Sequence, residues 1–464
     1  MPKKKTALTI EERLQQALVP AEEQPYEVPE NWVWVRLGAV AETISKGTTP
    51  KGGSAAYVDE GVNFLRVENL TSDGYISHSK ITHITEEMHE NYLKRSILKA
   101  NDLLISIAGS LGKSAIVREC DLPINTNQAI AFVRLFCNEV NVNYIRNTIE
   151  SPLINSTLTK QTKVTSIPNL TLEIIKDCPI PLPPLSEQQR IVDRIEELFA
   201  KLDEAKERLQ EVADSFAVRK AAILHKAFTG ELTKQWRREN GVSDESWEEK
   251  KLGEVGPWLG GGTPSTSHEE YWENGNILWV TSKDMKSTII EDTLMKVNEI
   301  GVKNSSANYI DEPALLVVMR SGILRRTFPV AMVKKPFTVN QDLKAIVPDK
   351  DDLEFLFWML LSNEQLILNT CMKNGTTVES INSKALKEFA FKCPSLPEQH
   401  EIVRLIDDLL ERERSAQQAA EQALASIELM KKSILARAFR GELGTNRASE
   451  ASAVELLKQV LAEN

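Results

Sequence analysis

The chain has 464 residues, of which 42% are hydrophobic and 26% charged, and its formal net charge is −10 at pH 7. This length allows two or three domains, each with its own core. Because no run of 18 apolar residues occurs and MPKKKTALTIEERL lacks the apolar core of a signal peptide, neither a membrane span nor secretion is supported. An odd number of cysteines without a CxxC pair indicates reduced thiols in a cytoplasmic protein: Cys120, Cys137, Cys178, Cys371 and Cys393.

The chain begins with an extension that leads into a globular body. Residues 1–27 are a charged extension with a short helix-like run, IEERLQQALV. The body, residues 28–184, opens with ENWVWVRLGAV and then a loop rich in glycine and hydroxyl residues, KGTTPKGG, which exposes backbone N–H groups. Further on, DLLISIAGSLGKSAIV (102–117) consists of two apolar runs around a glycine-bearing turn, which predicts a hairpin. Short strands with few helices favour an α+β class.

A long amphipathic helix is predicted next, within a spacer segment at 185–243. Ser186 and Gln189 match a capping box at its start, and Gly230 is suited to a left-handed conformation at its end. Its apolar residues alternate at spacings of four and three, which is the heptad pattern of a helix that packs on a partner. The predicted seam residues of this helix are Ile191, Ile195, Leu198, Leu202, Leu209 and Phe216.

The second part of the chain repeats the first. A second body at 244–395, a second spacer helix at 396–444 and a tail at 445–464 are predicted. ESWEEKKLGEV matches the opening of the first body, and PSLPEQHEIV to ILARAFRGEL matches the long helix without a gap. Such a duplication predicts two similar globular halves, with the two helices as each other's partners. The seam residues of the second helix are Ile402, Ile406, Leu409, Ile427 and Ile434.

The sequence offers no recognisable catalytic site. Gly109–Ser114 resembles part of a phosphate-binding loop, but Ile107 stands where the loop requires glycine. The six histidines lack metal-ligand spacing, and surface positions are expected for His78, His83 and His89. GxSxG, HExxH and GxGxxG after a strand are all missing, as is the cofactor loop of a DNA adenine methyltransferase. We therefore predict no catalytic residue, no metal site and no cofactor in this chain.

Two similar bodies suit a molecule with two reading heads, since DNA presents related grooves one helical turn apart. Arginine pairs with guanine, asparagine or glutamine with adenine, and lysine with phosphate. The acidic net charge does not exclude this, because basic groups can gather on one face. The candidate DNA-binding residues of the first half are Lys46, Thr48, Lys51, Arg66, Asn69, Ser110, Lys113 and Lys163. Those of the second half are Thr263, Ser265, Thr281, Lys283, Arg320, Arg325, Arg326, Lys373, Asn374 and Thr376.

Several of these motifs together resemble the DNA-specificity subunits of type I restriction–modification enzymes. The resemblance covers Asn31 to about Leu443 and includes ENWVWVRLGAV, the Gly-Gly-Thr-Pro loop followed by Tyr271-Trp272, ILWVTSKDM and PLPPLSEQQRIV. The two helix ends, ILHKAFTGEL and ILARAFRGEL, belong to the same pattern. One departure is the first loop, KGTTPKGG, which lacks a following Tyr-Trp pair.

The resemblance implies a non-catalytic recognition and scaffold subunit. Two target-recognition domains would each bind one half of a split, asymmetric site on double-stranded DNA. The two helices would form an antiparallel coiled coil with pseudo-twofold symmetry, which sets the spacer between the half-sites. Implied partners are two methyltransferase subunits that use S-adenosylmethionine and two restriction subunits that use ATP and Mg²⁺.

Two other functions are compatible with the same repeats. A protein–protein adaptor could bind two equivalent partners through the helices without recognising DNA, and the acidic net charge slightly favours it. A fusion-type enzyme would have to methylate or cleave DNA by itself. Loss of DNA affinity on substitution of Arg320, Arg325 and Arg326 by Ala would separate recognition from the adaptor.

Overall fold

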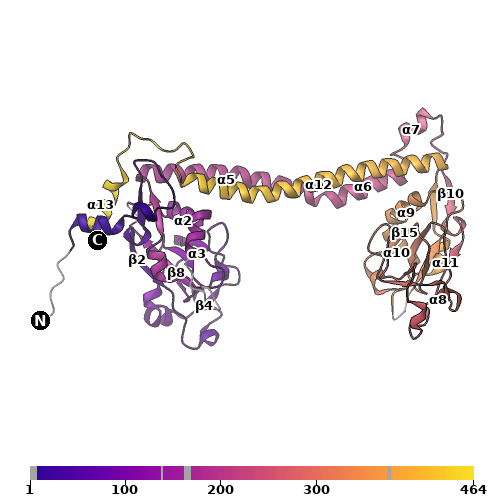
Figure 1. Cartoon of the computed structure of the whole chain (residues 1–464), viewed down its shortest axis with the longest axis horizontal. Coiled ribbons are helices and arrows are strands. Elements are labelled where there is room, and N and C mark those ends of the chain that lie inside the picture. Colours follow the sequence, from indigo (N-terminus) through magenta and orange to yellow (C-terminus); the bar gives the residue numbers. More distant parts are fainter. Residues whose placement is uncertain (1–7, 137–138, 161–168, 374–377, 464) are drawn as a thin grey trace. The chain divides into compact units, whose positions relative to one another are not determined.

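The computed structural model describes residues 8–136, 139–160, 169–373 and 378–463. The chain divides into two compact units, Met1–Leu209 with Gln422–Asn464 and Gln210–Glu421. Each unit contains one body of mixed strands and helices and a stretch of both long helices (Figure 1). The predicted α+β class with two similar halves is therefore confirmed.

The body of unit 1 is built on two small sheets. Its four-stranded antiparallel sheet has the order β2(Ala41–Lys46)-β8(Ile130–Leu135)-β5(Leu103–Ser106)-β6(Ser114–Ile116). Its three-stranded sheet, in which β3 and β7 are parallel, has the order β4(Thr82–Ile84)-β3(Val62–Leu65)-β7(Ile124–Thr126). A third sheet has two antiparallel strands, β1(Val33–Arg36) and β9(Pro179–Leu182), and it joins the beginning of the body to its end. The unit's helices outside the long pair are α1(Ile10–Ala17), α2(Val142–Glu150), α3(Pro152–Lys160), α4(Leu172–Lys176) and α13(Ala453–Glu463).

Unit 2 repeats this topology strand by strand. Its four-stranded sheet has the order β11(Trp258–Leu259)-β17(Leu343–Ile346)-β14(Ala314–Val318)-β15(Val330–Val333). The three-stranded sheet has the order β13(Met295–Val297)-β12(Ile277–Val280)-β16(Phe337–Val339), and β12 and β16 are parallel. The joining pair is β10(Glu248–Lys251) and β18(Ala390–Cys393). Its shorter helices are α7(Lys234–Glu239), α8(Glu299–Lys303), α9(Leu353–Ser362), α10(Glu364–Cys371) and α11(Ser383–Lys387). The hairpin predicted at 102–117 is confirmed as β5–β6, and β14–β15 is its repeat in unit 2.

The central strand β5 of unit 1 is buried on both faces because side chains alternate across a sheet. Leu103 and Ile105 pack into a core that also contains Tyr144 of α2. Leu104, on the opposite face, packs with Leu65 of β3 and other residues of the three-stranded sheet. The four-stranded sheet thus lies between α2 and the second sheet, which explains why β5 is a continuous apolar run.

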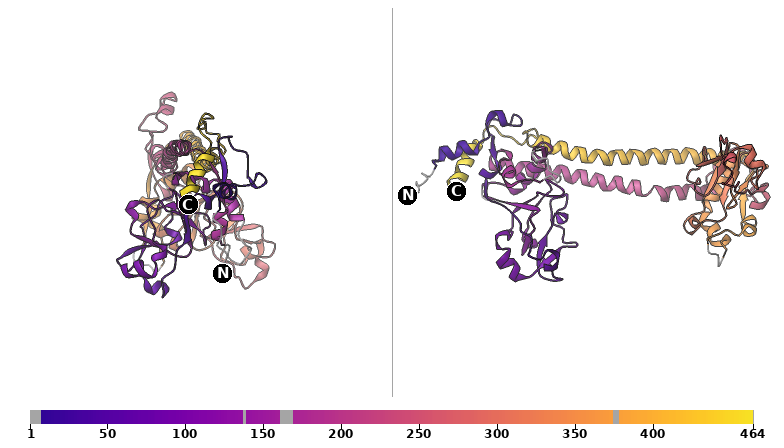
Figure 2. Two further views of the ribbon diagram at one scale, coloured as in Figure 1. Left: turned by 90° about the vertical axis from the view of Figure 1, so that its left-hand side faces the viewer. Right: turned by 60° about the horizontal axis from the view of Figure 1, so that its bottom comes forward.

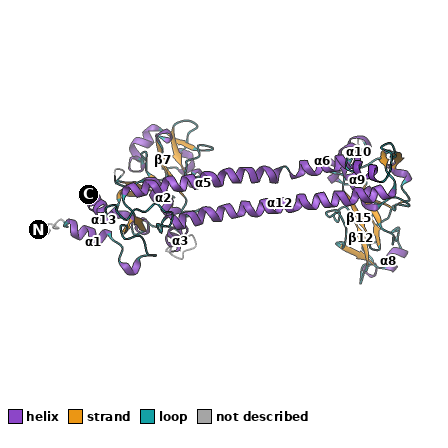
Figure 3. Ribbon diagram, turned by 90° about the horizontal axis from the view of Figure 1, so that it is seen from above, coloured by secondary structure: helices purple, strands orange, loops and turns teal. Residues whose placement is uncertain are grey.

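The long helices are α5(Leu185–Asp214), α6(Phe216–Phe228) and α12(Leu396–Ala438). Within unit 1, Asp203 pairs with Lys431 at 2.5 Å and Lys206 with Glu428 at 3.0 Å. As the numbering rises on α5 it falls on α12, so the helices run antiparallel in this unit, and Figures 2 and 3 show them side by side. Arg219 of α6 pairs with Glu413 of α12 in unit 2.

The predicted seam residues differ in burial along the helices. Ile191 and Ile195 belong to the core of unit 1, and Ile402 and Ile406 to the core of unit 2. The first turns of each long helix are therefore anchored in a globular body. Ile427 is also buried, whereas the remaining predicted positions are half-buried: Leu198, Leu202, Leu209, Phe216, Leu409 and Ile434.

A buried carboxylate begins each long helix and ties it to the end of the other. In unit 1, Glu187 accepts hydrogen bonds from Trp32 Nε1 at 2.8 Å and from Asn446 Nδ2 at 2.9 Å, just beyond the end of α12. In unit 2, Glu398 accepts from Thr233 Oγ1 at 2.7 Å and Arg237 Nη1 at 2.6 Å, just beyond the end of α6. Burial raises the pKa of Glu187.

The glutamine after each buried glutamate has a matching role. Gln188 Nε2 donates to Pro183 O at 3.0 Å, and its Oε1 accepts from the N–H of Asn141 at the start of α2. Gln399 makes the same two contacts, to Pro394 O and from the N–H of Asp352 at the start of α9. The helix start, the proline-rich approach and the body's main helix are thus joined by one side chain in each unit.

Two predicted helix features are wrong. The Ser186–Gln189 capping box is absent, because α5 begins one residue before Ser186 and the N–H groups of Glu187 and Gln188 bond to Pro184 O instead. The predicted continuous helix is interrupted at Ser215, between α5 and α6. Ser215 Oγ donates to Val212 O at 2.9 Å, which offers that carbonyl a partner other than the next helical N–H.

Other expectations concern glycines, histidines and cysteines. Gly230 has φ +77°, as predicted for a helix stop. His89 is buried rather than exposed, since its Nδ1 lies 3.3 Å from Asn125 Nδ2 inside the body. Cys178 and Cys393 are core residues as predicted, and burial raises the pKa of each thiol to about 12. Cys137 lies outside the described residues.

The Arg237–Glu398 pair provides a stability test. Arg237→Met leaves a buried carboxylate without its charged partner, and we expect a loss of about 3–5 kcal/mol in the free energy of unfolding of unit 2. Arg404→Met, at an exposed pair with Glu401, should leave the free energy of unfolding almost unchanged. Urea unfolding of the full chain measures both. The double variant Arg237→Met/Glu398→Met should recover most of the loss; equal losses for Arg237→Met and Arg404→Met would contradict this account.

Candidate nucleic-acid interface

The glycine-rich loop of each unit packs against the strand that precedes an Asn-Gln pair, which is Asn127-Gln128 in unit 1 and Asn340-Gln341 in unit 2. A Cβ at Gly261 would lie 1.9 Å from Val339 O, at the end of β16. In unit 1, a Cβ at Gly47 would lie 2.2 Å from Thr126 O, at the end of β7. Only glycine permits such a close approach of two backbones. The loops are therefore seated on the parallel strand pair.

In unit 2 this arrangement gathers several polar segments around one hollow. The hollow has a volume of about 470 Å³. Its lining residues come from the loop after β11, from the segments after β12 and β16, and from the start of β13: Thr263, Trp279, Thr281, Ser282, Lys283, Asp284, Leu294, Met295, Asn340, Gln341 and Asp342. Thr263 Oγ1 donates to Gln341 Oε1 at 2.9 Å, which joins two of these segments directly.

The turn between β14 and β15 extends this surface. Arg320 Nε donates to Asp342 Oδ1 at 2.8 Å, which ties the turn to the hollow. Arg325, on a short 3-10 helix (Gly322–Arg325), donates through Nε to Glu379 Oε1. The hydrogen bond from Arg325 lowers the pKa of Glu379. We call the hollow together with Arg320, Arg325 and Glu379 the polar edge of unit 2.

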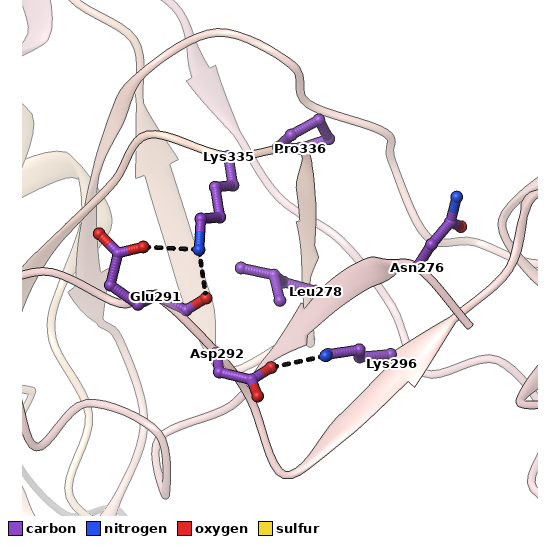
Figure 4. A pocket seen from close by; sticks show the side chains of 7 residues that line it. All are labelled: Asn276, Leu278, Glu291, Asp292, Lys296, Lys335 and Pro336. Carbon is purple, nitrogen blue, oxygen red and sulfur yellow. Dashed lines mark hydrogen bonds and ion pairs between the residues drawn. The ribbon is translucent and has the colours of Figure 1, made fainter. Parts of the chain in front are cut away.

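A second hollow in unit 2 has a different character. Its volume is about 510 Å³, and Figure 4 shows its lining side chains. Lys335 Nζ lies 2.6 Å from Glu291 Oε2, and Lys296 Nζ lies 2.9 Å from Asp292 Oδ1. These charges neutralise one another in pairs, and none of the predicted candidates lines this hollow.

A comparison with known families gives the context for this geometry. The family model described as the type I restriction modification DNA specificity domain matches residues 29–214 and 244–423. The chain belongs to this family. The two matches correspond to the two repeats, so the family's domain occurs twice.

Relatives in this specificity family differ in how much of the chain they match. The EcoR124I/EcoR124II specificity subunit of Escherichia coli is 40% identical over 159 residues, which are 34% of this chain and 39% of that protein. The EcoBI specificity subunit of Escherichia coli is 31% identical over 216 residues, 46% of this chain and 44% of that protein. These two matches thus span less than half of those relatives. The EcoKI specificity subunit of Escherichia coli strain K12 is 24% identical over 470 residues, 94% of this chain and 96% of that protein.

Solved structures share the fold. The HsdS subunit from Thermoanaerobacter tengcongensis has a TM-score of 0.65 at 20% identity, over 91% of this chain and all of that one. A chain from a study of complex assembly and conformational transition of the type I R-M system has a TM-score of 0.63 at 20% identity, over 90% of this chain and all of that one.

The candidates of the second half lie at or near the polar edge. Thr263, Thr281 and Lys283 line the hollow, Arg320 hydrogen-bonds its lining residue Asp342, and Arg325 lies in the same turn as Arg320. Ser265 lies in the glycine-rich loop with its Oγ 2.7 Å from Ser267 Oγ, and Arg326 follows the 3-10 helix with an exposed side chain. Exposed Lys373 donates its N–H to Ser380 O. Asn374 and Thr376 lie outside the described residues.

The candidates of the first half are more dispersed. Lys46 ends β2, Thr48 and Lys51 lie in the loop after it, and Ser110 and Lys113 lie in the β5–β6 turn. Lys163 lies outside the described residues.

Arg66 and Asn69 do not fit the expectation of free contact groups. Asn69 is 2% exposed; its Oδ1 accepts from the N–H of Arg66 and its Nδ2 donates to Ser77 O. This amide holds a turn of the body together, so we omit Asn69 from the proposals below. Arg66 is only partly exposed, with a terminal amino group 2.6 Å from Glu68 Oε1.

Several residues of both surfaces were not among the predicted candidates. Arg95 Nη2 donates to Thr48 Oγ1 at 3.3 Å, and Tyr92 lies under the Lys51 ammonium, which is 5.4 Å from the ring centre. In unit 2, Asn340 and Gln341 line the hollow. The matching pairs Asn127-Gln128 and Asn340-Gln341 were visible as a repeat, whereas Arg95 and Tyr92 carry no motif.

Metal and membrane sites are not indicated. Groups of three or more His, Cys, Asp or Glu side chains placed to hold a metal ion do not occur in the described part of the chain. Within the same residues, no helix has both the length and the apolarity needed to cross a bilayer.

The packing of the glycine-rich loop can be tested with two alanine substitutions. Gly261→Ala must displace either the loop or β16, and we expect it to destabilise unit 2 by about 1–3 kcal/mol and to weaken DNA binding. Gly322→Ala has its nearest neighbour at 4.0 Å and should change stability by less than about 0.5 kcal/mol. Urea unfolding and fluorescence anisotropy with duplex DNA measure the two effects. A neutral Gly261→Ala variant would contradict the close approach.

Proposed function

We propose that the chain is the DNA-recognition and scaffold subunit of a type I restriction–modification complex. Each globular body binds one half of a split, asymmetric DNA site. The observation that carries this proposal is the double occurrence of the DNA specificity domain, each copy with a glycine-rich loop and a polar Asn-Gln segment seated on the same strand pair. Several relatives bear the name specificity subunit, which supports the same function.

The side chains at the polar edge suit direct readout of bases. Arg320 and Arg325 are exposed donors, Gln341 offers an exposed amide, and exposed Lys283 is placed for a phosphate. In unit 1, Thr48, Lys51 and Arg95 form the corresponding set beside the first loop. Because the two sets differ, the two half-sites differ in sequence.

Partners supply the chemistry in this proposal. Two methyltransferase subunits carry S-adenosylmethionine, and two restriction subunits carry ATP and Mg²⁺. This chain holds no cofactor, has no catalytic residue and acts in the cytoplasm. The long helices form an antiparallel coiled coil that sets the spacer between half-sites, and their outward faces dock the methyltransferase subunits. The predicted boundaries, with bodies at 28–184 and 244–395, serve as the limits of the two recognition domains.

The decisive experiment separates DNA recognition from a protein–protein adaptor. Methylation mapping in a host with and without the gene identifies the target duplex. The full chain with its methyltransferase partner should bind that duplex in preference to random DNA. Arg320→Ala/Arg325→Ala/Arg326→Ala should weaken this binding roughly 30-fold or more. This estimate assumes that two base contacts are lost and that each contributes about 1 kcal/mol or more to the binding free energy.

A charge-matched variant is the control for this experiment. Lys334→Ala/Lys335→Ala/Lys350→Ala removes three exposed positive charges from the same body away from the polar edge. It should keep the preference for the target, and both variants should assemble normally. An arginine variant with unchanged DNA affinity would favour the adaptor. Methylation by the chain alone would favour a fusion-type enzyme.

The spacer proposal has its own test. Seven residues inserted into both helices, near Leu209 and Gln422, preserve the heptad pattern and add about 10 Å of helix at 1.5 Å per residue. The recognised spacer should lengthen by about three base pairs at roughly 34 Å per turn of DNA. Methylation mapping of a host with the altered gene reports the new spacer. An unchanged spacer would refute the proposal while leaving DNA recognition intact.

A further inference from the structure

Two arginines at the polar edge differ from the others that hydrogen-bond carboxylates. Arg320 and Arg325 donate to Asp342 and Glu379 through Nε, and their terminal amino groups donate to no described residue. Elsewhere in the described chain, carboxylate-bound arginines also use a terminal amino group. Arg134, for example, gives Nε and Nη2 to Asp102. Arg219 gives Nε to Glu413 but also donates Nη2 to Val212 O at 3.3 Å.

A guanidinium held through Nε keeps a defined plane and presents Nη1 and Nη2 as two parallel donors. Guanine presents two acceptors, O6 and N7, on its major-groove edge, and a paired donor from arginine matches them. The side chains of Arg320 and Arg325 are 57% and 70% exposed, so their terminal groups are accessible. Both arginines are thus held at one end and free at the end that guanine recognises.

The two acidic partners are fixed more firmly than the arginines that they hold. Asp342 O accepts from the N–H groups of Met319 and Arg320, and the Asp342 side chain is 22% exposed. Glu379 O accepts from the N–H of Ser321 at 3.0 Å, and the Glu379 side chain is 19% exposed. Both acids are therefore bound by backbone hydrogen bonds to the turn that carries the arginines.

We propose that Asp342 and Glu379 are positioning residues that orient Arg320 and Arg325 toward guanine. The half-site bound by unit 2 then contains two guanines, one for each arginine. This inference rests on the proposed function and deepens it by naming bases. The corresponding turn of unit 1 contains Ser110 and Lys113 and no arginine, so this pair of acid-held arginines belongs to one half-site.

The first test uses the target duplex with single guanines replaced by 7-deazaguanine, which loses N7 but still pairs with cytosine. With the full chain and its methyltransferase partner, replacement at two positions of one half-site should weaken binding roughly tenfold each. Arg320→Ala should abolish the effect at one of these positions and Arg325→Ala at the other. Binding that is insensitive to every replacement, but still selective for the target, would overturn the inference and leave the proposed function standing. Loss of all sequence preference would overturn both.

The second test removes the acids. Asp342→Asn and Glu379→Gln each delete a negative charge near DNA, so general electrostatics predicts tighter binding to every duplex. If the acids position the arginines, their removal should instead reduce specificity. The ratio of the affinity for the target duplex to the affinity for random DNA should fall about fivefold or more, while the affinity for random DNA stays equal or rises. A ratio that stays constant would show that the acids only adjust charge.

A matched variant controls for charge and folding. Glu388→Gln removes the same charge from an exposed ion pair in the body of unit 2, away from the polar edge and the long helices, where Lys251 Nζ donates to Glu388 Oε2. It should leave both random affinity and the target ratio unchanged. Thermal unfolding of all three variants verifies that any change in the ratio occurs in folded protein. A fall in the ratio for Glu388→Gln equal to that for Glu379→Gln would overturn the positioning role.

Discussion

The buried glutamate at the start of each long helix is the interaction on which the architecture depends. A carboxylate removed from water is costly unless hydrogen bonds satisfy it. Glu187 obtains its donors from Trp32 and from Asn446, and Glu398 obtains its donors from Thr233 and Arg237. Each of these carboxylates thus receives donors from the segment that follows the other helix, although the buried Oε2 of Glu398 has no hydrogen-bond partner among the described residues. This requirement makes unit 1 discontinuous in sequence and brings part of both long helices into unit 2, so neither repeat is a unit by itself.

The two units satisfy the buried glutamate with different kinds of hydrogen-bond donor. In unit 1 the donors are neutral and burial raises the pKa of Glu187, so the ionised form is disfavoured there. In unit 2 a guanidinium faces the carboxylate at 2.6 Å, which compensates the buried charge directly. The repeats therefore keep the glutamate while exchanging its donors. The geometry of the helix junction, rather than one particular donor, is what both copies share.

The sequence predicted the features that depend on local pattern and were present twice. Helix stops at Gly230 and Gly441, both with positive φ, and the hairpins of β5 and β14 follow from residue type and spacing. Expectations failed where a distant partner decided the outcome. Ser186 and Gln189 have the right types for a cap, but the helix starts at the preceding residue and Gln189 Oε1 accepts from Asn141 Nδ2. The assignment of Asn69 as a DNA contact stays a prediction, and its amide is hydrogen-bonded within its own turn.

For the candidate interface, the residue types in the sequence indicated which turns contact DNA. The hydrogen-bond partners of those residues depend on the tertiary structure and could not be predicted. Arginines in a polar turn could be predicted, but Asp342 and Glu379 lie 22 and 54 positions away in sequence and had no signal of their own. Their effect is to neutralise part of the basic surface while orienting what remains. This also explains how a chain with net charge −10 can present a DNA-binding edge. Each acidic side chain at this edge holds an arginine by Nε and leaves the terminal amino groups of that arginine facing outward. The acid then does not repel DNA, because its charge is paired with the guanidinium. The geometry of the terminal donors, and not the net charge, decides which bases are accepted.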